Sequence, residues 1–245
     1  MAGIGTIVNV MAIIAGGLCG LVTRRFLEER YQETIMKATG FAIIVMALGS
    51  TLSQMLVVKI AEAGDKLTGS LDTQGTIMMI LSLVLGALLG EWINLDRWFE
   101  RFGAWLRDRS GNQEDRRFID GFVSASLTVC VGAMAVIGSL EDGIRQDPQM
   151  LYAKAILDLI IIMIMTASLG KGCIFSAVSV GIFQGTITLL ARGIAPVLTE
   201  EAVSNLSLVG NVLILCVGVN LIWPRTIRVA NVLPAIVFGM VFALI

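Results

Sequence analysis

The chain has 245 residues, of which 56% are hydrophobic and 15% are charged, and its mean hydropathy is +0.84. This composition excludes a water-soluble domain, because such domains carry about a quarter of their residues as charges. The formal net charge of −1 gives no argument for binding to nucleic acid or to an acidic partner.

Apolar blocks of about twenty residues recur along the chain and are separated by charged segments. A helix of ~20 apolar residues crosses ~30 Å of hydrocarbon, so each block predicts a transmembrane helix. The predicted spans are residues 4–22, 36–58, 75–93, 120–139, 152–169, 172–191, 206–223 and 228–245. The predicted fold class is therefore all-α, a polytopic transmembrane helical bundle of about eight spans that forms a single integral membrane domain over residues 1–245.

Basic residues are distributed unevenly between the two sides of this bundle. If the uncharged residues 1–5 lie outside, thirteen of the 18 Lys and Arg residues fall on the cytoplasmic side. These thirteen are Arg24, Arg25, Arg30, Lys37, Arg97, Arg101, Arg107, Arg109, Arg116, Arg117, Lys171, Arg225 and Arg228. The positive-inside rule then predicts that both termini are outside. The tryptophans agree, because Trp92, Trp98, Trp105 and Trp223 all fall at predicted cytoplasmic ends, where the ring suits the headgroup level.

An amphipathic segment lies between the third and fourth spans. Its apolar residues recur at helical spacing, and its charged residues fall mostly on the opposite side. The apolar residues are Leu95, Trp98, Phe99, Phe102, Trp105 and Leu106. The pattern predicts a helix in the cytoplasmic interface. A partner-binding helix has the same pattern, although membrane anchoring is the simpler interpretation.

Two G-x-x-x-G pairs, Gly16 with Gly20 and Gly86 with Gly90, predict close helix packing. Such glycine faces also make a homo-oligomer a reasonable expectation.

A possible internal repeat relates residues 5–58 to residues 75–139. Gly5-Thr6-Ile7, with Gly16, Leu18 and Gly20, reappears as Gly75-Thr76-Ile77, with Gly86, Leu88 and Gly90. Chance similarity explains such a match equally well in a chain rich in Gly, Leu and Ile, so both interpretations stay open.

Polar residues are concentrated in residues 138–158, where Ser139 and Asp142 precede Lys154 and Asp158. Lys154 and Asp158 are four residues apart on one helix face. Asp158 is expected ~9 Å below the start of its span. An ionisable group at that depth suggests a proton or cation relay, with Asp158 titrating and Lys154 tuning it. A purely structural pair that holds helices together is the equal alternative.

Other polar side chains are predicted within the spans. Asn9 and Gln184 are expected in the outer half with Asp158, whereas Glu91 and Asn231 are expected nearer the cytoplasm. Each of them can also serve as a hydrogen-bonding link between helices. The candidate substrate or ion pathway comprises Asp158, Lys154, Asn9, Gln184, Ser139, Asp142, Glu91 and Asn231.

The sequence gives little evidence for a metal site or for catalytic residues. The four cysteines show no C-x-x-C spacing and the chain has no histidine, so neither a metal site nor a cofactor is predicted. Serine–histidine catalysis is excluded by the missing histidine, and an intramembrane aspartyl protease needs two facing carboxylates. We therefore expect no enzymatic activity and no catalytic residues.

The chain resembles the YqgA/YdfK-type family of uncharacterised bacterial inner-membrane proteins, a domain of unknown function. The residues that carry this resemblance are Asn9, Gly16-Gly17, Gly90-Glu91, Gly138-Ser139, Gly143, Asp147-Pro148, Lys154, Asp158, Asn231 and Leu233-Pro234. The resemblance implies a multi-pass protein of the bacterial plasma membrane. Transport is only a supposition for that family, so the resemblance transfers no mechanism.

Two classes of function follow. The first is a transporter or channel for an unidentified small solute or ion. The second is a non-transporting membrane scaffold or regulatory partner, suggested by the amphipathic helix. The expected partners are the lipid bilayer, a small solute or ion and further copies of the chain, and no nucleic acid.

Overall fold

The computed structural model describes residues 2–26, 28–63, 66–113, 115, 117–130, 133–194 and 199–243. The long helices are α1 (Ile4–Arg25), α2 (Glu29–Met55), α3 (Thr76–Ile93), α4 (Leu95–Arg109), α7 (Gln149–Leu169), α8 (Ser176–Ile194) and α9 (Glu200–Ile222). Shorter helices are α5 (Phe118–Cys130), α6 (Ala133–Ile144), α10 (Val229–Val232) and α11 (Pro234–Phe242), and a 3-10 turn, η1 (Lys171–Phe175), leads into α8. The predicted helical membrane bundle is confirmed.

The prediction of about eight spans needs correction at two places. Within the described residues, six segments are long and apolar enough to cross a membrane: α1, α2, α3, α7, η1 with α8, and α9. The predicted span 120–139 is bent: α5 and α6 are inclined at 62°, and the two helices together are long and apolar enough to form a seventh span. The predicted span 228–245 consists of α10 and α11, which meet at Pro234. Proline lacks the N–H that would continue the helical hydrogen bonds, so the helix divides there.

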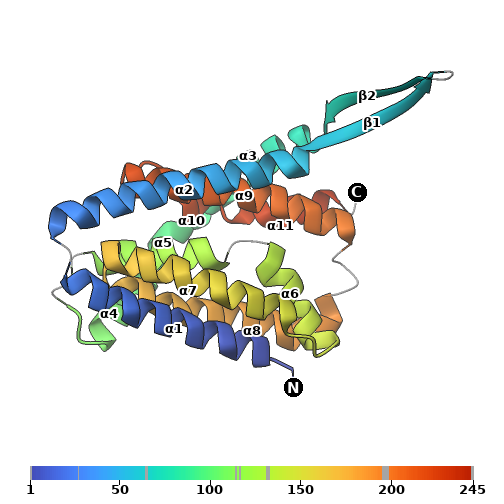
Figure 1. Ribbon diagram of the computed structural model, residues 1–245. Coiled ribbons are helices and arrows are strands. Elements are labelled where there is room, and N and C mark those ends of the chain that lie inside the picture. Colours follow the sequence, from blue (N-terminus) through green and yellow to red (C-terminus); the bar gives the residue numbers. More distant parts are fainter. Residues whose placement is uncertain are drawn as a thin grey trace.

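The predicted second span is also wrong at its ends. The helix α2 begins at Glu29 and ends at Met55, and the chain then enters a hairpin of β1 (Leu56–Ala63) and β2 (Lys66–Thr73). The strands are antiparallel, with Leu56 opposite Thr73 and Ala63 opposite Lys66. The sequence Leu56-Val57-Val58 is as apolar as a helix end, but its β-branched valines suit a strand. The hairpin projects beyond the end of α2 (Figure 1).

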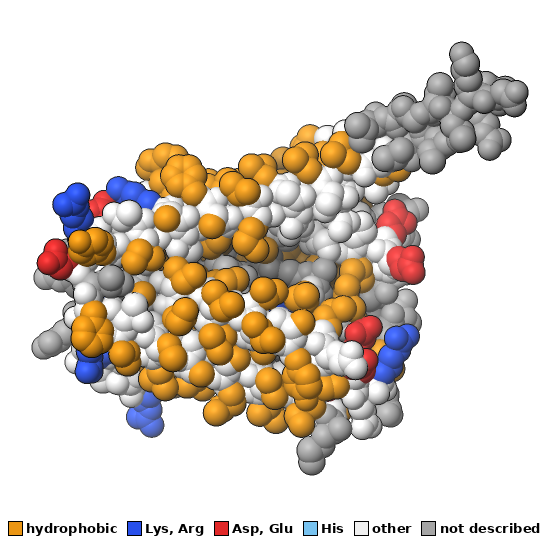
Figure 2. Space-filling view, viewed as in Figure 1, with side chains coloured by type: hydrophobic (Ala, Val, Ile, Leu, Met, Phe, Trp, Pro, Cys, Tyr) orange, Lys and Arg blue, Asp and Glu red, His pale blue; other side chains and the backbone are white. Residues whose placement is uncertain are grey.

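The bundle has two charged ends and an apolar middle. Charged side chains gather at both ends of the face in Figure 2, and hydrophobic side chains cover the surface between them. Large apolar side chains such as Val45 and Leu189 are 67% and 86% exposed. A belt of exposed apolar side chains between two charged ends is expected where a protein contacts the hydrocarbon of a membrane. The two termini lie at the same end of the bundle, as the topology predicted (Figure 1).

Helix α1 packs closely along α7, and the two helices run in the same direction (Figure 1). Gly16 lies against the backbone carbonyl of Leu159, and Gly20 lies against that of Met163. A side chain at either glycine would meet α7 backbone, so the predicted role of this pair in close packing is explained.

The second pair, Gly86 and Gly90 on α3, lies against Ala235 and Asn231 near the chain's end. Both glycine faces are therefore covered within the chain, so they no longer support the expected homo-oligomer. Gly86 contacts α11 and Gly90 contacts α10, so the chain segment that faces α3 runs opposite to it, and the two glycine pairs differ in packing. The internal repeat stays a prediction.

The amphipathic segment forms helix α4, as predicted. One part of its apolar face packs on α5, where Phe102 contacts Phe122 edge-on at a centroid distance of 5.7 Å. Trp98 and Trp105 remain 64% and 58% exposed. These exposed rings at the charged end match a helix that lies in the membrane interface.

We predict that Gly16→Val lowers the free energy of unfolding by about 2 kcal/mol, because the added atoms overpack against the α7 backbone. Thermal unfolding in detergent measures this effect. Gly49→Ala on α2 is the control, since nothing lies within 4 Å of an added methyl group there. Equal unfolding midpoints for the two variants would contradict this account of the α1–α7 contact.

Candidate functional site

A buried ion pair lies on α7. Lys154 Nζ is 2.9 Å from Asp158 Oδ1, and their side chains are only 10% and 3% exposed. Because α7 begins at Gln149, earlier than predicted, Asp158 lies ~13 Å from its start rather than ~9 Å. The pair therefore sits near the middle of the helix, where leaving an unpaired charge in hydrocarbon would be most unfavourable.

Two amides from other helices join this pair. Asn9 of α1 donates from Nδ2 to Asp158 Oδ2 at 3.0 Å and to Gln184 Oε1 of α8 at 3.3 Å. Asn9 and Gln184 are fully buried. The predicted grouping of Asn9 and Gln184 around Asp158 is thus observed, and it links α1, α7 and α8.

A second buried carboxylate, on α6, contacts α1 one helical turn before Asn9. Asp142 of α6 is fully buried, and its Oδ2 accepts the Gly5 backbone N–H at 3.0 Å. Gly5 belongs to the first turn of α1, where free N–H groups and the helix dipole favour an anion. Ser139, also on α6, is buried but donates to its own helix at the Ala135 carbonyl, 2.6 Å away.

Several buried polar atoms around these residues have no hydrogen-bond partner among the described residues. They are Thr6 Oγ1, Asn9 Oδ1, Asp142 Oδ1, Gln184 Nε2 and Thr188 Oγ1. Buried polar groups in proteins nearly always have a partner, so five such atoms on three adjoining helices mark a place suited to a polar ligand.

We call this group of side chains the polar core. It consists of Thr6, Asn9, Asp142, Lys154, Asp158, Gln184 and Thr188. The two threonines were missed in the sequence. A signal existed, since Thr6 is three residues before Asn9 and Thr188 is four residues after Gln184, which puts each on the same helix face as its amide.

Glu91 and Asn231 lie apart from the polar core, at the opposite end of the bundle. Glu91 is exposed and pairs with Arg228 at 3.1 Å. Asn231 is buried and accepts the Asp96 backbone N–H at 2.6 Å, which fixes the start of α4. Their depth near the charged loops is as predicted, but no hydrogen bond among the described residues joins them to Asp158.

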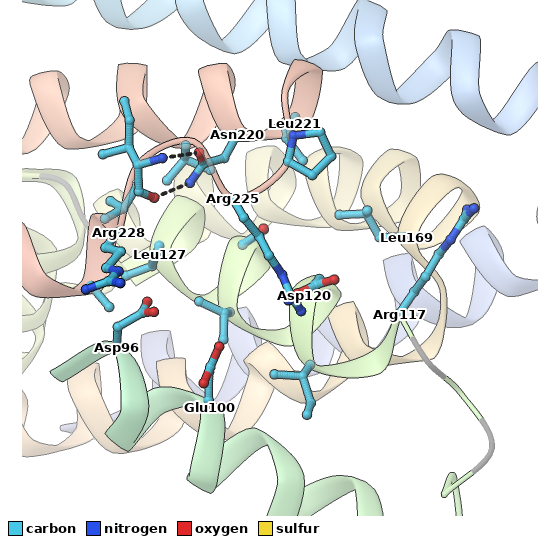
Figure 3. A pocket seen from close by; sticks show the side chains of 18 of the residues that line it. Asp96, Glu100, Arg117, Asp120, Leu127, Leu169, Asn220, Leu221, Arg225 and Arg228 are labelled. Atoms are coloured by element: carbon cyan, nitrogen blue, oxygen red, sulfur yellow. Dashed lines mark hydrogen bonds and ion pairs between the residues drawn. The ribbon is translucent and has the colours of Figure 1, made fainter. Parts of the chain in front are cut away.

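A cavity of about 590 Å³ opens at this same end, among α4, α5, α9 and α10 (Figure 3). Its rim is charged, and Arg225 points toward Asp120, with 3.1 Å between the two side chains (Figure 3). Burial raises the pKa of the Asp96 carboxyl on the rim, and the charge of Arg228 opposes that rise. Its inner wall is apolar and includes Val123 and Leu127.

The turn that forms one wall of the cavity is held by Asn220. Its side chain donates to the Ile227 carbonyl at 2.7 Å and accepts the Ile227 N–H at 2.9 Å (Figure 3). Arg225, inside this turn, has a left-handed φ of 59°, which is unfavourable for a residue with a side chain. The sequence did not predict this cavity, because its charged rim comes from α4, α5 and the turn after α9, which are far apart in the sequence.

Helix α5 contributes to the cavity wall and also packs on α7, the helix of the ion pair. Leu127 lines the cavity, and three residues later α5 ends at the half-buried Cys130, which packs against the apolar cluster that includes Ile162 of α7.

The apolar belt, the long helices and the buried ion pair define a multi-pass helical membrane protein. The chain belongs to the family described as "Protein of unknown function (DUF554)", whose model matches residues 4–244. This confirms the family resemblance seen in the sequence.

Two curated relatives cover nearly the full chain. The "Uncharacterized membrane protein YdfK" of Bacillus subtilis (strain 168) is 27% identical over 232 residues, 95% of this chain and 92% of the relative. The "Uncharacterized protein YqgA" of Escherichia coli (strain K12) is 27% identical over 241 residues, 97% of this chain and 94% of the relative. No solved structure matches the chain.

We predict that Lys154→Ala lowers the free energy of unfolding by about 3–5 kcal/mol, because it leaves Asp158 charged and buried without its cation. The control is Lys37→Ala, which removes an exposed pair with the same spacing, 2.7 Å from Glu33. That loss should stay below about 1 kcal/mol. Thermal unfolding of the two variants in one detergent makes the comparison, and similar losses would contradict the burial of the Lys154–Asp158 pair.

Proposed function

We propose that this protein is a transporter that moves a small polar solute or ion across the bacterial plasma membrane. In this proposal the polar core binds the transported species, and the cavity is its entrance from the cytoplasm. A transporter is favoured over an open channel because the polar core is buried and none of its residues lines the cavity.

The polar core is the observation that carries the proposal. A pair needed only to hold helices together would be complete with Lys154, Asp158 and a neighbouring hydrogen bond. This group contains in addition a second carboxylate and unpartnered atoms on α1, α6 and α8. Each such atom is unfavourable in a buried apolar setting. A bound polar ligand would give these atoms a partner.

The broken helix supports the same proposal. Transporters commonly bind their substrates where membrane helices are interrupted near the middle of the bilayer. At 1.5 Å per residue, α5 and α6 are each ~20 Å long, so the break falls near mid-depth. The end of α5 lies near Lys154, whose charge complements the partial negative charge of a helix C-terminus.

The ion pair supplies a gate in this scheme. A cation or proton that reaches Asp158 competes with Lys154 for the carboxylate. If the bound species also displaces the Asn9 amide from Asp158 Oδ2, the hydrogen bond that joins α1 to α7 is lost, so α1, together with the Gln184 side chain of α8 that it contacts, is free to separate from α7. The differential affinity of the transported species for the opened arrangement drives the change.

We predict that solute-dependent currents of reconstituted vesicles on a solid-supported membrane are abolished in Asp158→Asn. A panel of amino acids, organic acids, sugars and inorganic ions serves as the substrate screen. Asp147→Asn is the matched control, because Asp147 is an exposed carboxylate that caps the Gln149 N–H at 3.1 Å, and it should keep the currents. Wild-type vesicles that respond to no member of the panel, like empty vesicles, would count against transport.

The orientation is part of the proposal, and the positive-inside bias supports termini outside the cytoplasm. A C-terminal alkaline phosphatase fusion in a Gram-negative host should then be active, while a C-terminal green fluorescent protein fusion should be dark. The reverse result, a fluorescent protein fusion that fluoresces and a phosphatase fusion that is inactive, would place the C-terminus in the cytoplasm and contradict the proposed orientation.

A further inference from the structure

We propose that Asp142 is the anchor of a binding site for a monovalent metal cation, completed by Thr6, Thr188 and Asn9. The site would lie at the end of the polar core farthest from the cavity. Binding itself needs no transport, but the role of this cation as the coupling ion rests on the proposed function.

Asp142 has a free, buried carboxylate oxygen. Its side chain is fully buried, Oδ2 is occupied by the Gly5 N–H, and Oδ1 has no partner among the described residues. The nearby Arg145 approaches Glu141, at 3.9 Å, rather than Asp142. A buried carboxylate oxygen without a partner is unfavourable, and a bound cation would give it one.

Neutral oxygens from two other helices adjoin it. Gly5, bonded to Asp142, directly precedes Thr6 on α1. On the other side of Asp142, Gly143 packs against α8 so closely that a methyl group there would be 2.5 Å from the Thr188 carbonyl oxygen. Asn9 lies one turn deeper on α1. Three helices therefore bring oxygen groups to the region of one carboxylate.

The two threonine hydroxyls are unusual for helical threonines. Thr51 and Thr128 each donate to the carbonyl four residues earlier, at 2.8 Å. The hydroxyls of Thr6 and Thr188 are buried without any partner among the described residues. Their lone pairs are therefore available to a ligand, and so is the carbonyl oxygen of Asn9.

The charge of the site sets the class of ligand. The buried charged side chains of the described chain are Asp142, Asp158 and Lys154, and Lys154 is taken by Asp158. One excess negative charge surrounded by neutral oxygens suits a hard monovalent cation such as Na⁺. Divalent Ca²⁺ sites usually gather more carboxylate ligands. A cation here would complete Asp142 while leaving the ion pair intact.

The test measures cation binding to the purified full chain in detergent. Thermal unfolding is followed in NaCl, LiCl, KCl and N-methyl-D-glucamine chloride at equal chloride, and ²²Na⁺ binding is measured by equilibrium dialysis. We expect at least one metal cation to raise the unfolding midpoint saturably over N-methyl-D-glucamine. Asp142→Asn should lose this shift, because an amide keeps the acceptor for Gly5 but not the charge, and Asp147→Asn should keep it.

Two further variants test the site independently if Asp142→Asn does not fold. Thr6→Val and Thr188→Val keep the side-chain shape and remove one oxygen each, so each should raise the half-saturating cation concentration by about 3- to 10-fold. Identical wild-type midpoints in all four chlorides, or an undiminished shift in Asp142→Asn, would overturn the site. Cation binding without any solute current would leave this site standing and overturn transport instead.

Discussion

The structure depends on the requirement that charges buried at membrane depth find partners inside the protein. Lys154 and Asp158 meet this requirement on one helix face, 2.9 Å apart. Their remaining hydrogen-bonding capacity draws in Asn9, and through it Gln184. Without water to replace these contacts, each neighbouring helix has to present its polar group at the right depth. This constraint sets the relative positions of α1, α7 and α8.

Glycine makes that arrangement possible. The amide of Asn9 is short, so α1 has to approach α7 closely for it to reach the second oxygen of Asp158. Gly16 and Gly20 permit the approach by lying directly against α7 carbonyls. The same residue choice at Gly143 brings α6 against α8 and carries Asp142 into the group. Small residues thus determine where the polar chemistry lies, although they contribute none of it themselves.

The sequence predicted the membrane class, most spans and the charged and amide members of the polar core. Block hydrophobicity reports the lipid environment, so it located α1, α3 and α7 well. It did not predict the structural features that are independent of contact with lipid. The hairpin after Met55 is apolar at its start, and the break between α5 and α6 leaves the apolar composition of the span unchanged.

The contacts of the site were harder to predict than its members. Asn9 and Asp158 are 149 positions apart, and only the fold shows that they bond. Thr6 and Thr188 carry no charge and therefore looked like ordinary helix residues. The cavity was not predicted because its charged rim residues, Asp96, Asp120, Arg225 and Arg228, lie far apart in the sequence and come together only in the fold.

The central claim is that the buried polar core opens to water during function. The most direct measurement is the reaction of Thr6→Cys with a membrane-impermeant thiol reagent in sealed right-side-out vesicles, in a background without the four native cysteines. Ile13→Cys on the same helix is the reference, because Ile13 is fully buried in an apolar cluster. The account predicts that Thr6→Cys reacts clearly faster than Ile13→Cys. Equal, negligible reaction at both positions would contradict it and would make the polar core a permanently sealed structural link.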